Sequence, residues 1–182
     1  MRMPDLTRDE MDDAQKQVAD EAASGKRGRM PAPLRAWIHS PQFGARAQKL
    51  GEFLRYDTIL GAQMSELAIL MVARRWTSHY EWYIHKKEAL NAGLEPQIVD
   101  AIAARTAPEF QDDKARSIYL YVTELHEKHV ISAETHAFAV EQLGERGVVE
   151  LVGLLGYYTL VSMTLNAFEI FPPEGEPREL EN

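Results

Sequence analysis

Hydrophobic residues recur along nearly the whole chain at the spacing of amphipathic helices, with charged and small polar residues between them. No segment shows the sustained alternation of apolar and polar residues that marks a half-buried strand. The pattern predicts an all-α fold, a single-domain helical bundle of about eight helices.

Capping residues and glycines set the expected helix boundaries. Thr7 and Glu10 have the spacing of a capping box, in which the two side chains satisfy free backbone amides, so the first helix is expected to begin there. Ser40, directly before Pro41, has the residue types preferred at the cap and first turn of another helix. The expected helices span residues 7–24, 40–56, 66–75, 79–93, 95–105, 112–128, 132–144 and 145–168.

Composition divides the chain into three parts. Residues 1–29 form an N-terminal helix followed by a basic loop rich in glycine, and residues 30–172 form the main helical domain. Residues 173–182 are acidic, contain proline and glycine, and offer almost nothing to bury. We therefore expect this C-terminal tail to be mobile.

One segment is long and apolar enough to raise the question of a membrane span. Residues 151–168 carry no charge over 18 residues, close to the roughly 20 that a membrane span needs. Glycine, serine, threonine and asparagine interrupt the segment, and a helix that is apolar on all sides also suits the centre of a bundle. We expect a buried central helix and no membrane partner.

Charge and cysteine content narrow the possible functions. The 182 residues include 28 acidic and 20 basic side chains, a net charge of -8, which argues against nucleic acid or an anionic membrane as a partner. The chain has no cysteine, which removes disulfides, thiolate nucleophiles and thiolate metal sites. The polar, acidic N-terminus lacks the order of a secretory signal, and we expect a cytoplasmic protein.

The segment "SHYEWYIH" concentrates polar and aromatic side chains in about two helical turns. Ser78, Glu81 and His85 fall within roughly 60° of one another around a helix. A histidine beside a carboxylate is a candidate for proton transfer. Two other interpretations stay open: Ser78 and Glu81 also have capping-box spacing, and a helix histidine is often only a structural hydrogen-bond partner.

The longer stretch "ELAILMVARRWTSHYEWYIHKKEALNAGL" resembles the core motif of the carboxymuconolactone decarboxylase and alkyl hydroperoxidase D-like superfamily. Peroxidases of that superfamily carry a Glu, eleven residues, Cys-x-x-Cys, three residues and a His. Glu66 and His85 match the Glu and the His without a gap, while Ser78 and Glu81 occupy the two cysteine positions. The resemblance covers roughly residues 30–172 and is strongest to the cysteine-free, decarboxylase-like branch.

The resemblance implies a carboxy-lyase that needs neither a metal nor an organic cofactor. It would release CO₂ from a small carboxylated lactone, or carry out related lactone or enol chemistry, with His85 as the acid and Glu66 as its partner. Glu81 would share that partner role or only cap the helix. The side chains expected to contact the substrate are Arg74, Arg75, Ser78, Trp82 and His39. The resemblance also implies a homotrimer or homohexamer.

Alternatives from other classes remain. The chain could be a non-catalytic, oligomeric binding protein of the same fold. A thiol peroxidase is disfavoured because a serine and a carboxylate cannot form or resolve a sulfenic acid. His126, His129 and His136 have a spacing that suggests a metal site, but the region is charged and we expect no metal there. Arg74 and Arg75 stand at a helix end, where a cation often only complements the helix dipole.

Overall fold

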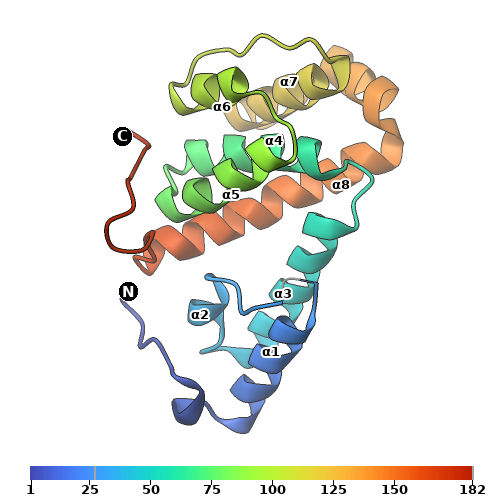
Figure 1. The fold of residues 1–182 in the computed structure, drawn as a ribbon. Coiled ribbons are helices and arrows are strands. Elements are labelled where there is room, and N and C mark those ends of the chain that lie inside the picture. Colours follow the sequence, from blue (N-terminus) through green and yellow to red (C-terminus); the bar gives the residue numbers. More distant parts are fainter. Residues whose placement is uncertain (27, 182) are drawn as a thin grey trace.

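The longest helix, α8 (Ala133–Ala167), runs through the middle of the molecule with helices on both sides (Figure 1). The computed structural model describes residues 1–26 and 28–181, and these residues form helices and loops with no strand, as the pattern predicted. Helices α4 to α7 form an upper layer in this view, and α1 to α3 form a lower layer. Their bounds are α1 Asp13–Ser24, α2 Leu34–Trp37, α3 Pro41–Tyr56, α4 Ala62–Arg75, α5 His79–Asn91, α6 Pro96–Ala103 and α7 Asp113–Lys128.

The N-terminus departs from its expected boundary. The predicted capping box does form, with the Thr7 backbone amide donating to Glu10 at 2.8 Å, but it leads only into a 3₁₀ turn, Arg8–Glu10. Met11 is extended and buried in the core, which ends that turn. Asp12 then begins α1 with its own capping box, accepting from the Gln15 amide at 2.8 Å.

The two helices expected at 132–144 and 145–168 are the two arms of α8. Ser132 caps the first arm by accepting from the Thr135 amide at 3.3 Å. Gly144, with φ 71° and ψ 165°, kinks the helix between the arms in a conformation that essentially only glycine adopts. By length and composition α8 is apolar enough to cross a membrane, but 61% of its most apolar window is buried inside the bundle. We interpret it as the expected core helix.

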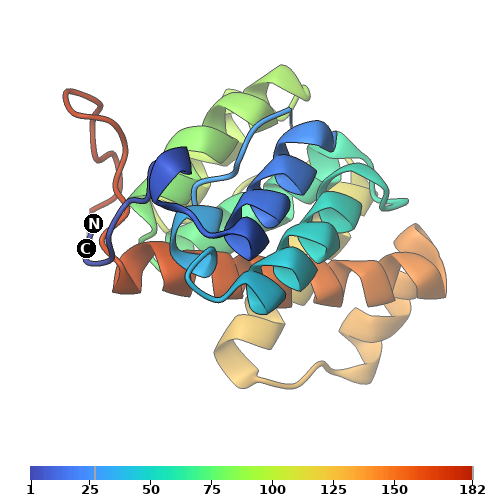
Figure 2. The ribbon, with the colours of Figure 1, turned by 90° about the horizontal axis from the view of Figure 1, so that it is seen from below.

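Both ends of the chain pack against the bundle. In α1, Val18 and Ala22 are buried in the common core, so the N-terminal helix belongs to the same domain. The tail, which we expected to be mobile, lies against α5: Glu179 accepts from the Trp82 indole at 3.3 Å, and Leu180 is only 4% exposed. Both termini lie on the same side of the molecule, where they overlap in one view (Figure 2) and stand apart in the other (Figure 1).

Candidate active site

Two neighbouring helices bring the predicted histidine and glutamate together. Glu66 lies on α4 and His85 on α5, and these helices pack against each other. The Nδ1 atom of His85 is 2.5 Å from Oε2 of Glu66. His85 is 3% exposed and Glu66 is 6% exposed, so water screens this hydrogen bond little. The pair that the family resemblance implied is therefore in direct contact.

Glu81 joins the same cluster on the other side of the imidazole ring. Its Oε1 atom is 2.9 Å from Nε2 of His85, one turn further along α5. We call Glu66, His85 and Glu81 the carboxylate–histidine triad. The alternative of a capping box is wrong, because Glu81 turns to the histidine and Ser78, although at the N-cap position, makes no capping bond. The Ser78 hydroxyl is buried and has no hydrogen-bond partner among the described residues.

The two carboxylates control the charge of the histidine. Burial by itself disfavours the imidazolium, but the charges and hydrogen bonds of Glu66 and Glu81 outweigh burial and raise the pKa of His85 from 6.5 to about 9. The imidazole is therefore protonated at neutral pH. Each of its two N–H groups then faces a carboxylate, and the triad holds a proton that it can transfer.

A tyrosine from α8 closes one side of the triad. The Tyr158 ring meets the His85 ring edge to face, with centroids 5.1 Å apart. Burial, together with the nearby Glu81 and Glu66, raises the pKa of Tyr158 well above its ordinary value. The Tyr158 hydroxyl therefore stays protonated and is available as a hydrogen-bond donor.

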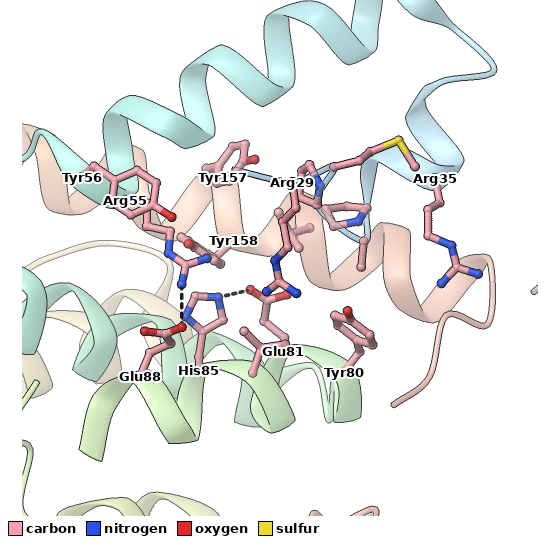
Figure 3. Close-up of a pocket in the computed structure, with 16 residues that line it drawn as sticks. Arg29, Arg35, Arg55, Tyr56, Tyr80, Glu81, His85, Glu88, Tyr157 and Tyr158 are labelled. Atoms are coloured by element: carbon pink, nitrogen blue, oxygen red, sulfur yellow. Dashed lines mark ion pairs between the residues drawn. The ribbon is translucent and has the colours of Figure 1, made fainter. Parts of the chain in front are cut away.

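Two members of the triad, Glu81 and His85, form one wall of a pocket of about 280 Å³ (Figure 3). Glu66, which pairs with Nδ1 of His85, does not line the pocket. The other walls come from α8 and from the lower layer. The remaining lining residues are Arg29, Met30, Pro31, Ala32, Pro33, Arg35, Arg55, Tyr56, Tyr80, Ile84, Glu88, Tyr157, Tyr158 and Val161.

Three arginines reach this pocket from the lower layer, and none of them was among the predicted site residues. Arg55 pairs with Glu88 at 3.3 Å, and Arg35 forms a two-pronged pair with Asp5. Arg29 has no ion pair with any carboxylate in the described part of the chain, and Figure 3 shows it pointing toward the triad. The only sequence signal was the basic loop before α2, whose position relative to His85 is set by tertiary packing.

Arg74 and Arg75 lie elsewhere, which corrects the prediction that they hold a substrate near His85. Both line a second pocket, which shares no residue with the first. Arg74 donates from Nε to the Ala103 carbonyl at 2.7 Å. The end of α4 directs these side chains toward α6 and α7, away from the triad.

The other expected contacts are also outside the pocket. Trp82 is fully buried and its indole faces the tail, while the His39 ring donates to the Pro4 carbonyl at 2.9 Å. Neither residue lines the pocket, and the expected contact Ser78, which is fully buried, does not line it either. Within residues 1–26 and 28–181 no three potential ligands come together as a metal site, and neither His129 nor His136 joins His126 in lining the second pocket.

Comparisons with known proteins identify the fold. No protein-family model and no curated protein matches the chain. The chain superposes on the alkylhydroperoxidase AhpD core of an uncharacterized peroxidase-related protein from Ralstonia eutropha JMP134, with a TM-score of 0.77 over 95% of this chain and 92% of that one. An uncharacterized peroxidase-related protein from Silicibacter sp. TM1040 gives a TM-score of 0.75 over 96% and 91%. Both are 14% identical to this chain, so the likeness shows an AhpD-core-like fold.

Proposed function

We propose that this protein is a cofactor-independent acid–base enzyme of the carboxymuconolactone decarboxylase type. Its substrate is a small carboxylated molecule, which it decarboxylates or converts by related lactone or enol chemistry. The observation that carries the proposal is the buried histidine held between two carboxylates, 2.5 and 2.9 Å away, at the wall of a pocket lined by three arginines.

The triad supplies the proton that the reaction needs. Loss of CO₂ leaves the bonding electron pair on the substrate, where a conjugated lactone accepts it as a dienolate, and a proton must then be added to carbon. Glu81 is the member of the triad with a carboxylate at the pocket wall. The Nε2 proton of His85 passes to Glu81 and from there to the substrate carbon, while Glu66 keeps the ring in place through Nδ1. Water later returns the proton to the triad.

The groups around the triad hold the substrate and its developing charge. Arg29 and Arg55 bind the substrate carboxylate, since a guanidinium matches the two oxygens of that group. The protonated Tyr158 hydroxyl donates to the enolate oxygen. These roles require neither a metal nor a thiol, which agrees with a chain that has no cysteine.

The first experiment incubates the purified protein with γ-carboxymuconolactone and follows CO₂ release and ultraviolet absorbance. We expect turnover by the wild-type protein and a loss of about 100-fold or more in kcat/KM for His85→Gln. His39→Gln is the matched control, since His39 lies outside the pocket, and it should retain full activity. An active His85→Gln variant would refute the mechanism, and an inactive wild type would retire this substrate.

The second candidate function, a non-catalytic binding protein, has one observation in its favour. Both ring nitrogens of His85 already face carboxylates, an arrangement that also suits a purely structural ion cluster. The two functions differ in what the pocket does with a small carboxylate. If the protein only binds, His85→Gln should hold a small carboxylate with the affinity of the wild type, and Arg29→Gln should bind it more weakly. Neither the wild type nor either variant would release CO₂.

The proposal includes a homo-oligomer, a trimer or hexamer. Val149, Val152 and Met163 lie on one face of α8 and are exposed, with Val149 at 72%. A second copy of the chain would cover this face, because an apolar stripe on a central helix is costly in water. Light scattering at micromolar concentration tests for the oligomer, and a monomer would contradict this part of the proposal.

A further inference from the structure

A second pocket of about 210 Å³ lies where the ends of α4 and α6 meet α7. It is separate from the pocket of the triad, and the proposed function makes no use of it. Its walls are Met71, Arg74, Arg75, Ile102, Arg105, Thr106, Tyr119, Thr123, His126 and Glu127. Three arginines and three residues that carry a hydroxyl group thus line one small space.

Two of these guanidinium groups converge on one neutral oxygen. Arg74 donates from Nη1 to Oγ1 of Thr77 at 3.3 Å, and Arg105 donates from Nη2 to the same atom at 3.4 Å. Arg74 is only 7% exposed, so its charge is largely removed from water. Burial and the neighbouring Arg105 lower the pKa of Arg74. A buried cation held beside a second cation is costly unless an anion balances them.

The described chain supplies no such anion at short range. None of the three arginines forms an ion pair with any carboxylate in residues 1–26 and 28–181. Glu127 is the one acidic residue among the walls, and Glu181 from the tail acts on Arg74 only at long range. Burial and Arg75 lower the pKa of His126 to about 4, so this ring adds no charge at neutral pH. The pocket has a surplus of positive charge.

The helix dipoles explain only part of this arrangement. Arg74 and Arg75 lie in the last turn of α4, and Arg105 follows the C-cap residue of α6, where cations are favourable. A dipole would be served equally by side chains spread apart over the surface. It gives no reason for three arginines from two helix ends to line a single pocket, where their charges repel one another.

We propose that this second pocket binds a phosphate group, either as inorganic phosphate or as the phosphate of a small monoester. Guanidinium groups form paired, charge-assisted hydrogen bonds with phosphate oxygens. Thr106, Thr123 and Tyr119 offer further hydroxyl donors along the walls. A tetrahedral dianion uses several donors from different directions, whereas a single carboxylate would leave most of them unpaired.

Isothermal titration calorimetry of the full chain tests the site. Sodium phosphate and glycerol 3-phosphate are titrated at constant ionic strength, and sodium acetate is the comparison anion. We expect saturable binding of phosphate or of the monoester, with the tighter of the two showing which form the pocket prefers. Arg105→Gln should weaken that binding about tenfold, and adding Arg75→Gln should abolish it. Both side chains are exposed, so the variants should fold normally.

Arg29→Gln is the matched control because it removes an arginine from the other pocket only. Phosphate binding should be unchanged in this variant. The proposal is overturned if the wild type shows no saturable binding, if acetate binds as tightly as phosphate, or if Arg29→Gln loses as much affinity as Arg105→Gln.

A titration of the histidines by nuclear magnetic resonance gives an independent readout. A bound phosphate beside His126 favours the imidazolium, so saturating phosphate should raise the pKa of His126 above its low value in the free protein. The same rise should occur in Arg29→Gln and be absent in the Arg75→Gln, Arg105→Gln double variant. A His126 titration that phosphate leaves unchanged would place the anion elsewhere and overturn the site.

Discussion

Raising the pH from 6 to 10 should weaken the fold, because it removes the positive charge that His85 places between two buried carboxylates. The folded protein holds this proton with a pKa of about 9, whereas the unfolded chain releases it near 6.5. The stabilisation is therefore complete below pH 6.5, declines as the pH rises through 9, and is absent at pH 10 and above.

The size of the effect follows from the difference between those two pKa values. It corresponds to about 3 kcal/mol of unfolding free energy, a large share of the roughly 5–15 kcal/mol that stabilises a typical domain. Because His85 is 3% exposed, solvent screening reduces this figure little.

Urea unfolding at a series of pH values and fixed protein concentration measures the stabilisation by the protonated His85, with tryptophan fluorescence and circular dichroism as probes. The wild-type free energy of unfolding should fall by about 3 kcal/mol more than that of His85→Gln between pH 6 and 10. Subtracting the variant removes the titration of lysines and exposed tyrosines. Parallel curves for the two proteins, or a His85 signal that titrates by nuclear magnetic resonance at or below pH 6.5, would refute the reasoning.

Three further predictions concern the helices and the tail. Gly144→Ala should lower the free energy of unfolding by about 1–3 kcal/mol, since the φ of 71° at this position is strained for alanine. Gly156→Ala, in a regular helical turn with open space around it, should raise the free energy of unfolding by up to about 1 kcal/mol. Chemical denaturation compares the two variants. Leu180→Ser should release the tail from α5 and make it sensitive to carboxypeptidase, which leaves the wild type intact. Val149→Glu should convert the expected oligomer into a monomer by size-exclusion chromatography with light scattering.

Local signals predicted most of the helices. Two expected helices begin at Asp112 and Ser132, and both side chains cap their helices by accepting from backbone amides, while Pro41 begins α3 as its position indicated. The four-residue helix α2 was missed because it is too short to show a period. The start of α1 was misplaced because two capping boxes follow each other, and only the packing of Met11 decides between them.

The residues of the candidate site were likewise predicted only in part. Glu81 and His85 were found because their spacing places them on one face of a single helix, α5, whereas Glu66 on α4 was found only through the family resemblance. Arg29 and Arg55 were missed because they come from the opposite layer, and nothing in their own segments relates them to His85. Arg74 was misassigned for the converse reason: it is close to the triad in sequence but points away from it in space.

The position of the first pocket between the two layers has a consequence for how this protein can change. The carboxylate–histidine triad belongs to α4 and α5, while the arginines of the pocket come from residues 28–35 and from α3, in the opposite layer (Figure 1). Under the proposed function, substitutions in the lower layer would alter which acid the pocket binds and would leave the histidine and its carboxylates in place. Specificity and chemistry would then belong to separate segments of the chain, so that design or natural selection could change one without the other.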